Sequence, residues 1–231
     1  MSDLMSILQR FKDDSNLYAD LIFDSEEPMN IVVELTDTGE TATLVLEREV
    51  GVSRIESGEK EADLKVTMAS QILRNIAEGK ADAFALAGRS KMSENRPIDF
   101  EFLNPARSEE AMEAIKGLGT YFFVPGLLKT KELKLERAGQ AHGARPIPLV
   151  YWQGIRTAWY HIDGGTTLNE DREIDPWPQA FIVLQGQGKA IIDDETLELE
   201  KERIYYIPRR VMHQIKASTD VQLIWMAWDA K

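Results

Sequence analysis

The stretch Glu173–His213, EIDPWPQAFIVLQGQGKAIIDDETLELEKERIYYIPRRVMH, determines how the second half of the chain folds. Short apolar runs alternate in it with turn residues, as where Phe181–Leu184 is followed by Gly186 and Gly188. Each run is long enough for a strand and too short for a helix. Short strands at regular spacing, separated by turns, predict a small all-β domain of the barrel or jelly-roll type.

The order of glycine, proline and histidine residues in this stretch resembles the two motifs of the cupin family. The first motif is G, five residues, H-x-H, three or four residues, E, six residues and G; the second is G, five residues, P-x-G, two residues, H, three residues and N. Gly186 stands at the closing glycine of the first motif, and Pro208 and His213 stand at the proline and histidine of the second. The resemblance therefore implies a cupin barrel.

The metal-binding positions of the family are changed in this chain. Counting back from the closing glycine places Gln179 at the glutamate, and Asp175 and Glu173 at the two histidines, while His213 is retained. Oxygen donors of this kind favour Mn, Mg or Ca over Fe or Zn, so a divalent metal is a possible cofactor. The alternative is that the two acids are solvated loop residues and that His213 is a hydrogen-bonded wall residue.

If Gln179 and His213 face the barrel interior, as the resemblance implies, strand alternation turns further side chains inward. These are Trp159, His161, Trp177, Phe181 and Tyr206. Aromatic side chains around a few polar groups suit a small organic ligand. The alternative is that they fill a barrel that is too small to hold a ligand.

Composition excludes several classes of function. The net charge of -12 opposes binding to nucleic acid and to anionic membranes. The chain has no cysteine, so thiol chemistry and disulfides are absent. It shows no signal peptide and no apolar run of the roughly 18 residues that a membrane span needs, which predicts a cytoplasmic protein without stable membrane insertion.

Composition also predicts two domains. All 5 tryptophans follow residue 150, whereas 24 of the 39 acidic residues precede residue 131. We expect one domain at residues 1–128, a linker at 129–148 that is rich in Lys, Glu, Gly and Ala, and a cupin domain at 149–231.

The first domain reads as strands followed by helices. Alternating or apolar runs predict strands at 21–23, 29–35, 41–47, 50–55, 63–67 and 97–103, and helical spacing predicts helices near 4–11, 70–78, 81–87 and from 108. This order indicates an α+β fold, an antiparallel sheet with helices on one face.

The passage Ala62–Phe102 resembles the sterol carrier protein type two family. The features shared with that family are Thr67, Met68, Gly79, Lys80, Phe84 and Gly88. The family binds lipids and other apolar molecules in a cavity between sheet and helices, which implies a cavity lined by Leu73, Ile76, Phe84, Phe100, Phe102 and Met112. The alternative is that these residues form an ordinary core.

Three hypotheses of function follow. The leading one is a non-catalytic binding protein, in which the first domain holds a lipid or another apolar small molecule and the cupin domain binds, senses or assembles. The second is a metal-dependent cupin enzyme of the oxygenase or isomerase type that acts on the molecule held by the first domain. The third is a structural role in which the cupin domain forms a homodimer.

Overall fold

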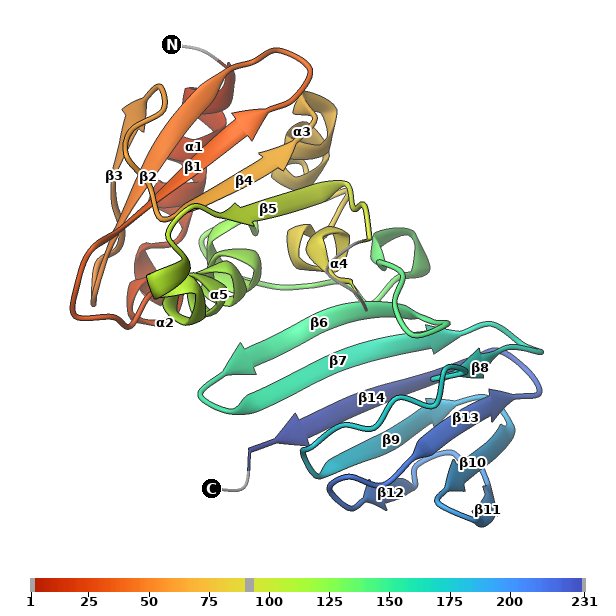
Figure 1. Cartoon of the computed structure of the whole chain (residues 1–231). Helices are drawn as coiled ribbons and strands as arrows, with labels where there is room; N and C mark the ends of the chain where they lie inside the picture. The colour runs from red at the N-terminus through yellow and green to blue at the C-terminus, as the bar shows by residue number, and fades with distance from the viewer. Residues whose placement is uncertain (1–2, 90–93, 230–231) are drawn as a thin grey trace. The chain divides into compact units, whose positions relative to one another are not determined.

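The structure, a computed structural model, describes residues 3–89 and 94–229 of the chain. The chain forms two compact units (Figure 1). The first comprises Met1–Ala87 and Asn95–Glu132, and the second comprises Gly88–Glu94 and Leu133–Lys231. Two features differ from the bounds expected from composition: Gly88, Arg89 and Glu94 group with the second unit, and residues 129–132 group with the first.

A five-stranded sheet forms the centre of the first unit. Its strands are β1 (Met29–Leu35), β2 (Thr41–Glu47), β3 (Gly51–Ser57), β4 (Leu64–Met68) and β5 (Ile98–Phe102), in the order β3-β2-β1-β4-β5. Alternate residues of β1, β2 and β4 are buried in one core, because successive strand residues point to opposite faces.

Helices cover that face of the sheet (Figure 1). They are α1 (Asp3–Asp14), α2 (Ala19–Ile22), α3 (Ser70–Ala77), α4 (Ala83–Ala87) and α5 (Ser108–Gly117). Short 3₁₀ turns at Asn16–Tyr18 and Pro105–Arg107 and a π-helical turn at Leu118–Phe122 connect or extend them. In α1, Leu4, Leu8 and Phe11 recur at helical spacing and are fully buried against the sheet.

Two expectations for this unit were wrong. The sheet is mixed, because β4 pairs parallel to β1 at Ile31–Leu35 and does not extend an antiparallel meander from β3. The predicted strand at 21–23 is instead the end of helix α2, since three apolar residues are too few to distinguish a strand from a helical turn.

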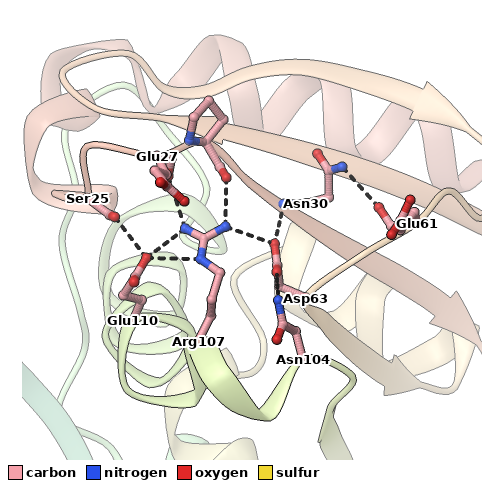
Figure 2. A network of polar contacts seen from close by, with 9 residues as sticks. Ser25, Glu27, Asn30, Glu61, Asp63, Asn104, Arg107 and Glu110 are labelled. Carbon is pink, nitrogen blue, oxygen red and sulfur yellow. Dashed lines mark hydrogen bonds and ion pairs between the residues drawn. The ribbon is translucent and has the colours of Figure 1, made fainter.

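Arg107 connects three segments of the first unit (Figure 2). Its guanidinium donates to the Glu110 carboxylate at 2.6 Å and to the Asp63 carboxylate at 3.2 Å. It also donates to the backbone carbonyls of Pro28, at 2.8 Å, and Glu27, at 3.1 Å. The side chain is only 15% exposed, so one arginine satisfies acceptors from the chain before β1, the loop before β4 and the start of α5.

The second unit is a β-sandwich of two mostly antiparallel sheets. One has the order β11-β10-β13-β8 and the other β12-β9-β14-β7-β6. The strands are β6 (Arg145–Trp152), β7 (Ile155–Ile162), β8 (Thr167–Leu168), β9 (Gln179–Gln185), β10 (Gly188–Ile192), β11 (Glu195–Glu198), β12 (Ile204–Ile207), β13 (His213–Ala217) and β14 (Val221–Trp228). The two sheets remain separate, so the expected cupin barrel or jelly roll is a two-sheet sandwich and not a closed barrel.

A tight hairpin joins β6 to β7. Its two turn residues, Gln153 and Gly154, have φ values of 42° and 81°. Two positive values are typical of the type I′ turn, whose twist suits a two-residue hairpin. Because β6 begins at Arg145, the last residues of the expected linker at 129–148 belong to a strand.

No helix in the described ranges is long and apolar enough to cross a membrane.

Candidate functional site

A cavity of about 420 Å³ lies in the second unit. Its walls come from β6, β7, β8, β9, β13 and β14, from the loop that precedes β9, and from Arg89 and His142. Six of the residues singled out from the sequence line it: Glu173, Asp175, Trp177, Gln179, Phe181 and His213. Residues that the sequence did not single out also line it, chiefly Tyr151, Arg156, Tyr160, Asn169 and Trp225.

Gln179 lines the cavity with a side-chain amide whose oxygen is hydrogen-bonded and whose nitrogen is available to a ligand. The side chain is 2% exposed, and its Oε1 accepts a hydrogen bond of 2.6 Å from the indole Nε1 of Trp225. Because an indole can only donate, this bond fixes which end of the amide is the oxygen. Within the described part of the chain, the amide Nε2 has no hydrogen-bond partner. The cavity therefore contains a neutral donor at the position where the resemblance implied an oxygen ligand for a metal.

Arg156 lies over Trp177, with its guanidinium carbon 3.9 Å from the centre of a Trp177 ring. Contact of this kind combines cation–π attraction with stacking and leaves the N–H edge of the guanidinium available. The tight hairpin places Tyr151 directly opposite Arg156, so both side chains emerge on the cavity face. Burial raises the pKa of Tyr151 to about 12, although Arg156 acts in the opposite direction, so the phenol stays protonated at neutral pH.

Asn169 holds the loop that forms one wall of the cavity. Its Nδ2 donates to the backbone carbonyls of Glu173 at 2.9 Å and His213 at 2.8 Å, and its Oδ1 accepts from the Glu173 backbone N–H at 2.9 Å. Asn169 adopts a φ of 59°, a left-handed conformation that asparagine tolerates better than most residues. The sequence did not predict this role, since no strand was expected directly before Asn169.

His213 is a buried imidazole, 7% exposed, on the cavity wall. Its ring lies 5.5 Å from that of Phe181, and its Nδ1 is 3.5 Å from the Val211 carbonyl oxygen. Burial lowers the pKa of His213, which outweighs the opposing effects of the Val211 carbonyl and of Asp175. The imidazole is therefore neutral at pH 7.

The residues expected to bind a metal do not fit one. Among the described residues, Glu173, Asp175 and His213 do not bring one ligand atom each within 4.8 Å of one another. Glu173 instead pairs with His142, with 3.1 Å between Oε2 and Nδ1, and Asp175 accepts the Trp177 backbone N–H at 2.9 Å. With the oxygen of Gln179 also engaged, the expected set lacks a common centre for an ion.

His161, Asp163 and Asp220 are the group within the described ranges that does bring three such atoms together. His161 Nε2 lies 3.2 Å from Asp163 and 4.0 Å from Asp220. The two carboxylates have other partners, since Arg145 is 3.5 Å from Asp163 and the Gly164 N–H donates to Asp220 at 2.9 Å. These contacts account for the cluster as a polar connection between two turns.

Three residues expected in the cavity lie elsewhere. Trp159 and His161 alternate with Tyr160, which lines the cavity, so their side chains project from the opposite face of β7. Tyr206 is 65% exposed on β12, and its neighbour Tyr205 is the one that packs in the core.

In the first unit, two of the six residues expected around an apolar cavity line one, and the other four do not. Phe84 and Phe100 line an apolar cavity of about 30 Å³. Leu73 and Ile76 belong to the fully packed core, Phe102 packs against that core, and Met112 is half-buried on α5 without lining the cavity. A volume of this size holds about one water molecule.

Residues 158–229 match the model of the cupin domain family. This part of the chain is a cupin domain. Several solved cupin structures resemble it, among them a cupin 2 conserved barrel domain protein from Salinispora arenicola, which is 16% identical with a TM-score of 0.39 and covers 45% of this chain and 90% of its own. A protein from Photorhabdus luminescens is 19% identical with a TM-score of 0.39, over 43% of this chain and 87% of its own.

An RmlC-like cupin from Shewanella frigidimarina is 18% identical with a TM-score of 0.36, over 39% of this chain and 79% of its own. No curated protein matches the chain. The cupin match begins at residue 158, so Tyr151 and Arg156 line the cavity from outside the matched range.

Proposed function

We propose that the second unit is a binding module for a small organic molecule, which the cavity of the cupin domain holds without a metal. The observation that carries this proposal is the cavity itself. Its volume of about 420 Å³ lies in the range of roughly 300–1,000 Å³ that is typical of small-molecule sites. Aromatic walls with a small number of fixed polar groups are also typical of such sites.

The engagement of the acidic groups favours binding over turnover. The Glu173 carboxylate pairs with His142, and the Asp175 carboxylate accepts a backbone N–H of its own loop. Both acids thus help to hold the wall of the cavity. The alternative of a metal-dependent oxygenase or isomerase needs several ligand atoms around one point, and the expected set does not supply them.

For the first unit we advance no lipid-carrying function. The apolar cavity of about 30 Å³ beside Phe84 and Phe100 is far smaller than an acyl chain or a sterol would need. Binding of a lipid would require the core between sheet and helices to open, and the burial of Leu73 and Ile76 opposes this.

The tryptophans provide a test of the cavity. In protein labelled with ¹⁵N at tryptophan, a ligand in the cavity should shift the indole N–H signals of Trp177 and Trp225. The signal of Trp159, on the opposite face of β7, should stay in place. Single Trp→Phe variants assign the signals. If a library of small aromatic acids, amides and alcohols shifts no cavity signal, or shifts only that of Trp159, the proposal fails.

A further inference from the structure

We propose that the ligand of the cupin cavity is an aromatic carboxylic acid of one or two rings, whose carboxylate binds the guanidinium edge of Arg156. This inference rests on the proposed function and adds the chemical class of the ligand. Three observations support it: an arginine without an acidic partner, aromatic walls, and a neutral donor on β9.

Arg156 has no carboxylate partner within residues 3–89 and 94–229. Its side chain contacts Trp177, with the guanidinium carbon 3.9 Å from the ring centre, a separation typical of a stacked guanidinium whose N–H edge stays available. A guanidinium edge presents a planar fork of N–H groups that matches the two oxygens of a carboxylate. Because Arg156 is half-buried, an anion that pairs with it is partly shielded from water, which strengthens the interaction.

The neighbouring groups do not neutralise Arg156. Tyr151, its direct cross-strand neighbour, stays a neutral phenol at neutral pH. Glu173 is paired with His142, and one Asp175 oxygen is bound to the Trp177 backbone. Both acids line the cavity, but neither forms an ion pair with Arg156 in the described ranges, so the N–H edge of Arg156 still lacks a carboxylate partner.

The remaining walls suit a flat apolar body. Tyr160 and Trp225 meet edge to face, with ring centres 6.3 Å apart and an interplanar angle of 83°. Rings at right angles provide one face and one edge against which a third aromatic ring can pack. The free Nε2 of Gln179 offers a donor to a second acceptor on the ligand, such as a ring hydroxyl.

The test compares acids with neutral analogues of the same shape. Isothermal titration calorimetry of the full chain would use benzoate, 4-hydroxybenzoate and 2-naphthoate, each beside its carboxamide. We expect each acid to bind at least about tenfold more tightly than its amide, because hydrogen bonds to a charged group are the stronger ones. The affinity of the acids should fall as KCl is raised, whereas that of the amides should not.

Variants at position 156 then test whether Arg156 provides the positive charge that binds the acid. Arg156→Gln should weaken acid binding by about 10- to 100-fold and amide binding by less than about threefold. Arg156→Lys, which keeps the charge and loses the fork, should give an intermediate loss. The matched control is Arg203→Gln, since Arg203 is exposed and pairs with Glu200 at 2.7 Å. It should leave both affinities unchanged, and thermal melting verifies that each variant is folded.

The outcomes separate the two proposals. Equal affinity for acids and amides, or acid binding that Arg156→Gln leaves intact, would overturn the present inference while the cavity remains a binding site. If no acid and no amide binds, and the indole signals of Trp177 and Trp225 do not move, both proposals fall. The salt dependence is measured on the native protein, so the inference stays testable even if substitutions at Arg156 disturb Trp177.

Discussion

Gln179 carries much of the chemistry of the cavity, because the Trp225 indole fixes its amide. Replacing it with glutamate would leave one oxygen for the indole and put the second where the unpartnered amide nitrogen now lies. We expect Gln179→Glu to lower the free energy of unfolding by about 2 kcal/mol at neutral pH, since a nearly buried carboxylate without a cation is costly. Urea denaturation measures this change.

A matched control exists on the same strand. Gln185 is exposed near the end of β9, so Gln185→Glu should change the free energy of unfolding by less than about 0.5 kcal/mol. Equal effects of the two substitutions would mean that the environment of Gln179 is not the reason for its cost.

His213 makes the stability of the second unit depend on pH. Its pKa is lowered by burial in the folded state, below the value of about 6.5 expected in the unfolded chain. Above pH 6.5 both states are neutral and the stability is fully present. As the pH falls below that value, the unfolded chain binds the proton more readily and stability is lost. Thermal melting at pH 7.5 and pH 5.5 should show a smaller decrease for His213→Gln than for the native protein.

The native protein should therefore lose more stability on acidification than His213→Gln does. If it loses no more, the surroundings of His213 do not keep the imidazole neutral.

Some residues of the cavity could be anticipated from the sequence and others could not, because successive residues of a strand point to opposite faces. Glu173, Asp175, Gln179 and His213 follow from counting between motif positions. On β7, aromatic residues occupy both alternating faces, Trp159 on one and Tyr160 on the other. A shift of one residue exchanges the two faces, so periodicity alone could not decide which side lines the cavity. Arg156 shares the face of Tyr160 and was missed with it.

Among the elements, the loop before β4 and the start of α5 depend on a single side chain. Arg107→Ala would remove the cation from the Asp63 and Glu110 carboxylates and leave the Pro28 carbonyl without its donor. We expect a loss of about 2–4 kcal/mol in the free energy of unfolding of the first unit, below the cost of a fully buried pair because Glu110 is partly exposed. Chemical denaturation followed by circular dichroism measures it.

Arg54→Ala serves as the comparison, because Arg54 is 60% exposed and forms only surface pairs with Glu47 and Glu56. Its loss should cost less than about 1 kcal/mol. Similar costs at positions 54 and 107 would show that the network in Figure 2 does not contribute beyond a surface pair.

The pairing of β1 with β4 shows what local sequence leaves undetermined at this scale. The individual strands could be read from alternation and turn residues. Nothing in the alternation of Leu64–Met68 indicates that the chain passes β2 and β1 after β3 and that this strand then pairs with β1 in parallel. That choice depends on how the helices cover one face of the sheet, which involves residues far apart in the chain.

For the whole molecule, we expect the purified protein to carry transition metal in less than one equivalent per chain. The oxygen of Gln179 is engaged, and Glu173, Asp175 and His213 do not converge on one point. Elemental analysis after dialysis against a chelator measures the metal content. Stoichiometric iron or zinc that survives dialysis and disappears in His213→Ala would contradict this and support an enzyme.

The division into two units predicts where a protease acts. Residues 95–132 belong to the first unit and β6 starts at Arg145, so the last of the connections between the units lies within residues 133–144. We expect trypsin at low dose to cut after Lys134, which is exposed, before it cuts either sheet. Mass spectrometry of the fragments identifies the first cut. First cleavage within Ile31–Val66 would show that the units are not the stable parts of the chain.

The hairpin that presents Tyr151 and Arg156 precedes the segment that matches the cupin family. The frame of the cavity and the arginine that faces into it are therefore encoded by different stretches of the chain. Substitutions at positions 151 and 156 would change the groups presented to a ligand, while the pairing of β8 to β14 stayed unchanged. Such a division lets a binding preference diverge in a lineage without first passing through unstable proteins.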